Sequence, residues 1–205
     1  MADDAFKLFV VENAKTSRAF LKELGLDLQS LEIREIEKSP LKELLQPIRD
    51  GQPIGLLSEA GCPAIADPGA ALVEAAHAAG IRVVPLVGPS SIVLALMASG
   101  LEGQRFAFCG YLPRDAAERT RRIRELEVRS RREHETEIFI ETPYRNDAML
   151  AALLENCAPG TRLCVAADLT LPSESIRTRT VGEWKKAPFQ IGKRPAVFLL
   201  LAQGR

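Results

Sequence analysis

Hydrophobic positions along the chain follow two periods, and their alternation predicts the order of secondary structure. Short apolar or alternating segments predict strands, and segments with apolar residues three and four apart predict helices. The predicted strands are 7–12, 31–36, 53–58, 81–86, 105–110, 137–141, 162–168, 174–181 and 195–202. The predicted helices are 15–24, one that opens at Ser39-Pro40, one from Pro68 to about Ala79, 91–99, 114–134 and 145–156.

Turn and capping residues set the expected helix ends. Gly25 and Gly80 stand where a helix would stop in a left-handed conformation. In Ser39-Pro40, serine has the place of an N-cap and proline that of the first helical residue. Asp67 is expected to cap the helix that begins at Pro68 in the same way.

Strands and helices alternate with short connections through the first half, which predicts a parallel sheet with helices on its faces. In the second half, 162–168 and 174–181 follow one another with no helix between them, so a mixed sheet is expected. We therefore predict an α/β protein with an N-terminal subdomain at 1–107, a C-terminal subdomain at 108–205, and a ligand cleft between them.

Ligands of open α/β sheets bind at the carboxyl ends of the strands. Four segments at such positions carry glycine, proline, serine or threonine, and they are 59–67, 87–91, 141–145 and 168–173. We expect these four segments to form the walls of the cleft.

Each segment also has a purely structural interpretation. Asp67, Ser90 and Ser91 would then be helix N-caps, Gly61 would supply a left-handed turn, and Asp168 would face solvent. His77 lies in the last turn of its helix, where a cation suits the helix dipole, so it is not predicted to be catalytic.

Arginine and glutamate alternate through 114–134. This pattern is typical of a solvated helix face with ion pairs three and four residues apart. The alternative is a face that contacts the phosphate backbone of a nucleic acid.

Composition excludes few functions. Hydrophobic residues make up 46% and charged residues 26%, and 27 basic side chains balance 27 acidic ones, so global charge does not indicate nucleic acid or an anionic membrane. The apolar run 195–202 is too short to span a bilayer. The four cysteines form no CxxC pair and the two histidines match no zinc spacing, so we expect no metal site and a reduced, cytoplasmic protein without a signal peptide.

Several catalytic signatures are absent from the sequence. It contains no GxGxxG after a strand, no GxxxxGK[ST] and no GxSxG. The residues alone therefore predict a two-lobed α/β protein with a small polar ligand at the strand ends.

Four longer stretches resemble a known family. Residues 56–101 (LLSEAGCPAIADPGAALVEAAHAAGIRVVPLVGPSSIVLALMASGL), 106–113 (FAFCGYLP), 139–145 (FIETPYR) and 166–170 (AADLT) are similar to motifs of the tetrapyrrole methylase superfamily. Within it, they resemble the branch of the small-subunit ribosomal RNA cytidine 2′-O-methyltransferases. The resemblance runs from about Phe6 to Leu201.

The resemblance implies S-adenosylmethionine (SAM) as cofactor, bound in the cleft between two α/β domains, and a homodimer. The residues that match cofactor-binding positions are Ser58, Ala60, Gly61, Cys62, Pro63, Ile65, Ser90, Ser91, Glu141, Leu169, Pro195 and Ala196. Gly61 would allow close approach of the backbone to the methionine part. No general base is assigned, because holding the acceptor in line with the methyl group can suffice.

The chain departs from the family pattern in three places. It begins at what resembles the family's second strand, so we expect an N-terminal domain that lacks the first one. Val87 replaces the first proline of a Pro-Gly-Pro turn, and 11–18 and 166–170 differ from the ribosomal RNA branch.

These departures bear on the acceptor more than on the cofactor. The leading hypothesis is methylation of ribosomal RNA, with Arg121, Arg122, Tyr144 and Arg145 as substrate contacts. The alternatives are a methylase of a small, tetrapyrrole-like molecule and a non-catalytic shortened homologue that serves as a binding or dimerisation module.

Overall fold

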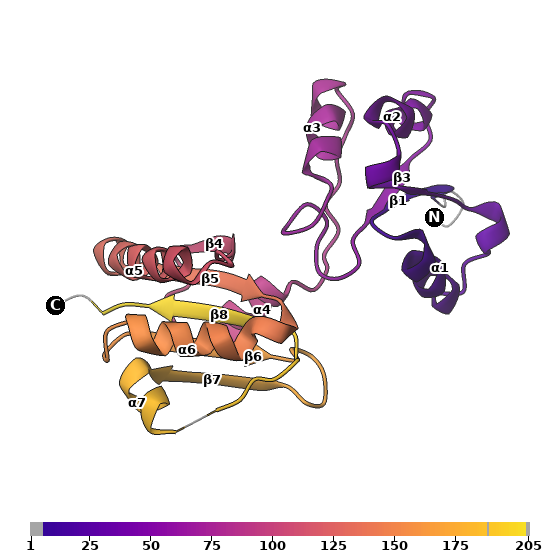
Figure 1. Cartoon of the computed structure of the whole chain (residues 1–205). Coiled ribbons are helices and arrows are strands. Elements are labelled where there is room, and N and C mark those ends of the chain that lie inside the picture. Colours follow the sequence, from indigo (N-terminus) through magenta and orange to yellow (C-terminus); the bar gives the residue numbers. More distant parts are fainter. Residues whose placement is uncertain (1–5, 188, 204–205) are drawn as a thin grey trace. The chain divides into compact units, whose positions relative to one another are not determined.

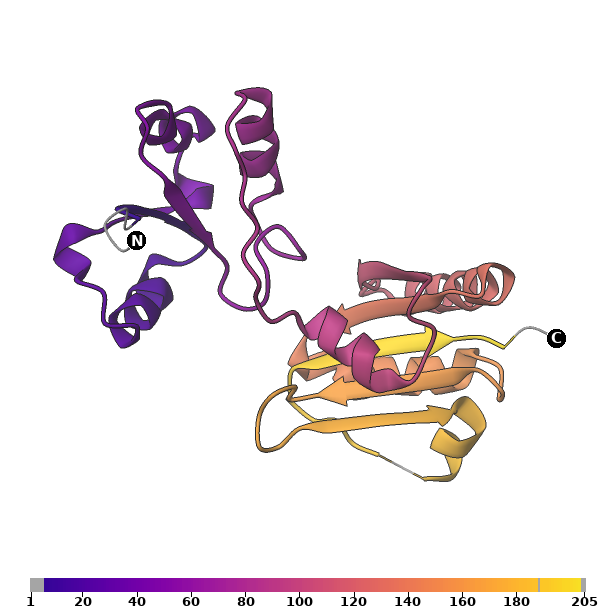
Figure 2. The same cartoon turned by 180° about the vertical axis from the view of Figure 1, so that it is seen from behind.

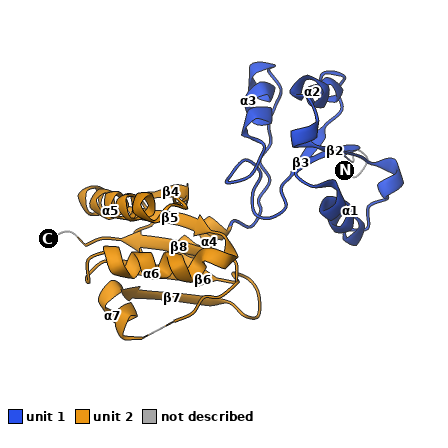
Figure 3. Cartoon of the chain, in the orientation of Figure 1, with its two compact units in different colours: residues 1–90 blue, residues 91–205 orange. Residues whose placement is uncertain are grey.

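The structure is a computed structural model that describes residues 6–187 and 189–203 (Figure 1). Its contacts divide the chain into two compact units, residues 1–90 and 91–205 (Figure 3). We call them the first and the second unit. The helix at 91–99 packs on the sheet of the second unit and is counted with it. The predicted boundary between two subdomains at 107 and 108 stays a prediction.

Three parallel strands form the sheet of the first unit in the order β2-β1-β3. The strands are β1 (Leu8–Val11), β2 (Glu32–Glu35) and β3 (Ile54–Leu57). The helical segments are α1 (Ala14–Glu23), η1 (Leu28–Ser30), η2 (Ile36–Lys38), α2 (Leu41–Arg49) and α3 (Ala70–Ala78). Alternate residues of β1 pack on opposite faces: Phe9 and Val11 contact Leu21 of α1, while Val10 contacts the α2 and α3 side. The expected parallel sheet is confirmed.

The predicted strand at 81–86 is wrong. Residues 81–90 have no regular secondary structure, and only Ile81 packs against the core of the first unit. Val84 and Leu86 are exposed by 56% and 78%. An extended apolar segment becomes a strand only when another strand pairs with it, and among the described residues no strand does so.

Two predicted N-caps are also wrong. Helix α3 begins at Ala70, and its N-cap is Gly69 with φ 138°, so the Asp67 side chain caps nothing. Helix α2 begins at Leu41 with Pro40 at the N-cap position and without a capping side chain, so Ser39 lies outside the helix. In both cases proline precedes the helix instead of occupying its first turn.

Five strands form a mixed sheet in the second unit in the order β4-β5-β8-β6-β7. They are β4 (Phe106–Tyr111), β5 (Thr136–Glu141), β6 (Arg162–Ala167), β7 (Ser175–Thr180) and β8 (Ala196–Leu201). β4 and β5 are parallel, and β8 runs antiparallel to both β5 and β6. The carboxyl ends of β5 and β6 therefore lie at the same end of the sheet, and we call this end the sheet edge. The expected mixed sheet is confirmed.

Helices cover both faces of this sheet. The helical segments are α4 (Ser91–Ser99), α5 (Ala116–Glu133), η3 (Pro143–Arg145), α6 (Asn146–Asn156) and α7 (Val181–Lys186). Phe198 faces the core under α5, α6 and α7, and its neighbours Val197 and Leu199 face α4. Figures 1 and 2 show α4 on one side of the sheet and α5 and α6 on the other. This three-layer packing gives the sheet edge a rigid base.

One ion pair joins α5 to this sheet, with the side chain of Glu137 fully buried and that of Arg129 34% exposed. Glu137, near the start of β5, is fully buried, and its carboxylate accepts a hydrogen bond from Arg129 Nε at 2.6 Å and a second from Arg129 Nη2. Arg129 Nη2 also lies 3.1 Å from Cys109 Sγ. Burial and the neighbouring Glu137 raise the pKa of the Cys109 thiol to about 11. The pair ties α5 to β5.

No helix in the described part of the chain is long and apolar enough to cross a bilayer.

Candidate functional site

A strained loop follows β3 in the first unit. Gly61 and Gly69 have φ angles of 78° and 138°, and Ala64 and Ala66, with φ of 66° and 63°, are also left-handed. An alanine in this conformation costs free energy that the surrounding structure must supply, and such strain collects at functional sites. No sequence signal marked Ala64 or Ala66, because alanine is not a typical left-handed residue. The loop at 58–69 thus has a defined backbone conformation.

Hydrogen bonds join two of the expected loops within the first unit. The Cys62 thiol donates to the carbonyls of Pro89, at 3.5 Å, and Gly88, at 4.0 Å. Ser58 Oγ donates to the carbonyl of Gly61 at 3.3 Å. The predicted residues of the Ser58–Ile65 loop therefore lie beside the segment that leads to Ser90.

Carboxylates line the base of this loop. The backbone N–H of Glu59 donates to Glu12 Oε2 at 3.4 Å, and Thr16 Oγ1 donates to the Glu59 carboxylate. Partial burial, and next to it the charge of Glu59, raises the pKa of Asp67 above its ordinary value. The carboxyl ends of β1 and β3 are thus acidic, which suits a ligand with positive charge.

In the second unit, predicted residues converge on one edge of the sheet. Glu141 ends β5 and pairs with Ala196 at the start of β8, and Ala196 pairs on its other side with Ala167 at the end of β6. The backbone N–H of Asp168 donates to the carbonyl of Pro195 at 3.0 Å. Leu169 follows directly and packs against the α4 side of the sheet. Glu141, Leu169, Pro195 and Ala196 are therefore brought together.

Ser91 belongs to the same edge. It is the first residue of α4, whose other end is tied to the opposite edge because Thr178 Oγ1 and Arg162 Nη2 donate to the carbonyls of Ser99 and Gly100. The amino end of α4 consequently points toward the edge that carries Glu141 and Ala196.

Both oxygens of the Glu141 carboxylate accept hydrogen bonds from other groups of the protein. Its Oε1 accepts from the backbone N–H of Thr142 at 2.6 Å, and its Oε2 accepts from Arg145 Nη2 at 2.5 Å. The Glu141 side chain is 1% exposed and that of Arg145 27%. Arg145, predicted as a substrate contact, thus holds the turn after β5, whereas its neighbour Tyr144 is 80% exposed.

Asp168 is a feature of this edge that the sequence did not reveal. It is 7% exposed, not solvated, and both it and Thr170 have left-handed backbones, with φ of 53° and 70°. The loop is held by Leu171 N–H donating to the Asp168 carbonyl at 3.0 Å and Thr170 N–H donating to Glu174 Oε2 at 2.8 Å. A second strained loop thus stands beside the predicted residues.

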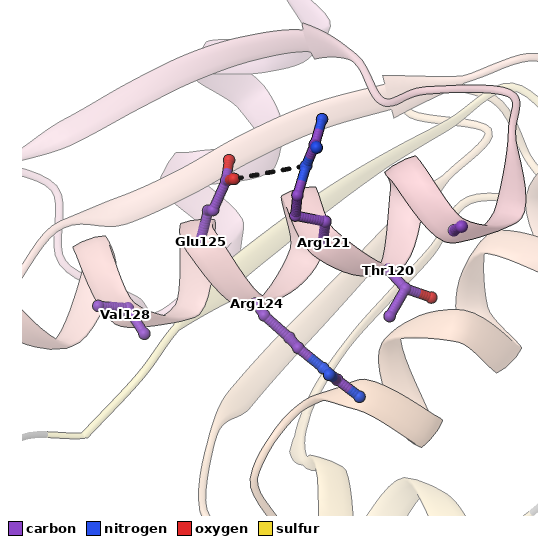
Figure 4. A pocket seen from close by; sticks show the side chains of 6 residues that line it. Thr120, Arg121, Arg124, Glu125 and Val128 are labelled. Atoms are coloured by element: carbon purple, nitrogen blue, oxygen red, sulfur yellow. Dashed lines mark ion pairs between the residues drawn. The ribbon is translucent and has the colours of Figure 1, made fainter.

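The exposed face of α5 carries the other predicted substrate contacts. Figure 4 shows a shallow surface pocket on this helix that includes Arg121 and Arg124 and none of the predicted cofactor residues. Arg121 and Arg122 share one partner, Glu125, at 3.8 and 3.3 Å, so the trio has a net positive charge. The ion pairs that were expected three and four residues apart are therefore present. The net positive charge of the three side chains is also available to an anion.

Comparison with known proteins places the chain in a family. The sequence profile of the Tetrapyrrole (Corrin/Porphyrin) Methylases matches residues 16–185. The chain is 33% identical over 181 residues to "Ribosomal RNA small subunit methyltransferase I" of Neisseria meningitidis serogroup B, covering 88% of the chain and 60% of that relative. It is 31% identical over 204 residues to the protein of the same name from Escherichia coli O157:H7, covering 98% and 69%. The chain thus spans about 60% to 70% of the length of these curated relatives.

Solved structures agree on the fold. The methyltransferase CobJ matches with a TM-score of 0.59 at 16% identity, over 97% of this chain and 95% of that one. Uroporphyrin-III-C-methyltransferase from Thermus thermophilus matches with a TM-score of 0.55 at 19% identity, over 96% and 83%. The profile match over most of the sequence, with relatives above 30% identity, shows that this chain belongs to the tetrapyrrole methylase family.

Proposed function

We propose that this chain is a SAM-dependent methyltransferase that methylates a ribose of ribosomal RNA. The observation that carries the proposal is the convergence of Glu141, Leu169, Pro195 and Ala196 on one edge of the second sheet. The names of the relatives support the RNA acceptor. The alternatives are methylation of a small tetrapyrrole-like molecule and binding without catalysis.

The residues present fit SAM chemically. Open space surrounds the position of a Cβ at Gly61, so a ligand can approach this backbone closely. Glu59 and Asp67 offer negative charge to the amine and sulfonium of the cofactor. The loop at 58–69 is therefore the part of the first unit that we propose as a cofactor contact.

The reaction needs mainly positioning. Bound SAM supplies a methyl group on a sulfonium, which is a good leaving group. The strained loops at 58–69 and 168–170 would hold their backbone groups in fixed places, and the acceptor oxygen would be kept in line with the methyl carbon. No residue is assigned as a general base. Homodimer formation and residence in a reducing cytoplasm complete the proposal.

Labelling of Cys62 tests the cofactor site. We expect maleimide at pH 8 to modify Cys62 first, because Cys62 is partly exposed whereas burial raises the pKa of Cys157 to about 12 and that of Cys109 to about 11. S-adenosylhomocysteine (SAH) at ten times its Kd should slow this reaction about tenfold. The labelled residue is identified by peptide mass, and Cys62→Ser serves as the control. An unchanged rate at saturating SAH, with binding shown by calorimetry, would place the cofactor elsewhere.

Charge reversal on α5 tests the RNA acceptor. Arg121→Glu with Arg122→Glu should weaken binding of an RNA fragment more than tenfold and lower its salt slope by about 1.4, the value for two phosphate contacts. Lys185→Glu with Lys186→Glu makes the same charge change on exposed residues of α7 and should have little effect. Filter binding at several salt concentrations measures both. If both double variants lose the same RNA affinity, the loss is a general effect of charge and α5 does not contact the RNA.

Transfer of labelled methyl groups separates the candidate functions. Label in cell RNA supports the proposed acceptor, and label in a small-molecule extract supports the alternative acceptor. SAH binding without transfer to either supports a binding module.

A further inference from the structure

An exposed aromatic ring stands at the sheet edge on a rigid support. Tyr144 lies in η3, directly after β5, and is 80% exposed. The turn is fixed on both sides of the ring, because Arg145 pairs with the buried Glu141 and the backbone N–H of Arg145 donates to the carbonyl of Thr142 at 2.9 Å. A large ring held in solvent by a buried ion pair does not serve the core of the protein.

A lysine lies over this ring from a different loop. Lys193 Nζ is 5.0 Å from the centroid of Tyr144. Its loop is pinned to the start of α6, where buried Asn146 donates to the carbonyls of Gly192 and Arg194 at 3.2 and 2.7 Å. The carboxylate of Asp147 accepts from the backbone N–H of Ile191 at 2.7 Å. These hydrogen bonds hold the backbone on both sides of Lys193 in place next to the start of α6, directly after Tyr144 and Arg145.

The neighbouring guanidiniums are already engaged. Arg145 is bound by Glu141, and Arg194 Nε donates to the carbonyl of Ile191 at 2.7 Å while its side chain lies over Phe189. The described structure gives Lys193 no carboxylate partner within 4.0 Å. Its charge is thus available to an anion beside the Tyr144 ring.

The pair flanks the residues that we assign to the cofactor. Tyr144 comes three positions after Glu141, and Lys193 two positions before Pro195. Glu141 and Pro195 lie at the same edge, since Glu141 pairs with Ala196. A group bound on Tyr144 would lie beside the residues of the second unit that we assign to the cofactor.

We propose that Tyr144 and Lys193 bind one unpaired base of the acceptor RNA and its adjacent phosphate, so that this part of the acceptor is single-stranded. The base stacks on the face of the ring that Lys193 does not cover, and the Lys193 ammonium pairs with the phosphate. A base inside a duplex offers no free face to a protruding ring. This inference rests on the proposed function.

Binding of short RNA tests the inference with three variants of the full chain. The probe is a fluorescein-labelled single strand of about 12 nucleotides, compared by anisotropy with the same strand in a duplex. Tyr144→Ala should lower single-strand affinity about tenfold, Tyr144→Phe should keep it, and Lys193→Gln should reduce the salt slope by about 0.7. Duplex binding should be weaker than single-strand binding and should change little in all three variants.

Several results would overturn the inference. The first is that Tyr144→Ala binds the single strand with wild-type affinity, and the second is that it loses affinity equally for single strand and duplex. The third is that polyglutamate at equal charge competes fully with the RNA, which would assign the site to an acidic protein segment. SAH titration runs in parallel. If SAH binds but Tyr144→Ala binds RNA as the wild type does, only this inference fails. If SAH does not bind, the proposed methyltransferase activity fails. The RNA measurements then still decide the role of Tyr144.

Discussion

Gly69→Ala should lower the affinity of the chain for SAH about thirtyfold, a loss of roughly 2 kcal/mol within the range for local backbone strain. Gly69 is buried with φ 138°, a conformation that side chains rarely adopt. A Cβ there would lie 3.0 Å from Leu56 Cδ2 and 3.3 Å from the backbone nitrogen of Ala64. The loop that closes between 61 and 69 would therefore relax, and restoring it would consume binding free energy.

The matched control is Gly51→Ala. Gly51 also has a left-handed backbone, with φ 83°, but a Cβ at this turn after α2 meets no atom within 4 Å. Both variants should lose stability through the unfavourable φ, on the order of 1 kcal/mol, and only Gly69→Ala should lose SAH affinity. Calorimetric titration measures affinity, and urea unfolding measures stability. Unchanged affinity in Gly69→Ala would show that this loop does not hold the cofactor.

Arg129→Ala should lower the free energy of unfolding of the second unit by about 3 kcal/mol. The substitution leaves the Glu137 carboxylate without its cation, and Glu137 is fully buried. The remaining neighbour, Cys109, cannot replace the charge, since burial holds its pKa at about 11 and keeps the thiol neutral. The unfolding midpoint in urea, followed by the fluorescence of buried Trp184, reports the loss.

The double variant Arg129→Met with Glu137→Leu shows whether the pair itself stabilises the unit. Because burial desolvates Glu137, and solvent screens Arg129, whose side chain is 34% exposed, most of their attraction is offset, and we expect the double variant to be close to wild type in stability. A double variant as unstable as Arg129→Ala would mean that α5 depends on the ion pair beyond the burial of one charge.

Most elements of the second unit could be predicted from the sequence to within two residues, but α7 was not predicted as a helix. Its strands alternate residues such as Ile138 and Phe139 that face two apolar layers, and long flanking helices such as α5 separate most of them. Both patterns are local, so neighbouring residues suffice to define each element. The same reasoning failed at 81–86, where the apolar pattern is equally good but pairing depends on a distant strand.

The candidate site could be predicted only in part. Glu141 and Ala196 are far apart in sequence, and the family resemblance, not their spacing, assigned both to the cofactor. Their meeting depends on the register of β5 against β8. Lys193 could not be predicted, because its loop is brought near Tyr144 by hydrogen bonds with Asn146 and Asp147, which are distant in sequence.

Concentrated solutions of this protein carry a specific risk of association. In the described chain, β3 is an outermost strand of its sheet, so one row of its backbone N–H and C=O groups is not paired with another strand. The same unit displays Val84, Leu86 and Val87 on an extended, uncharged segment. Open strand edges are templates for pairing between copies, whereas Pro85 and Pro89 disfavour pairing of the exposed segment as a strand. Covering the open side of β3 consequently helps to keep the protein dispersed, independent of any role in catalysis.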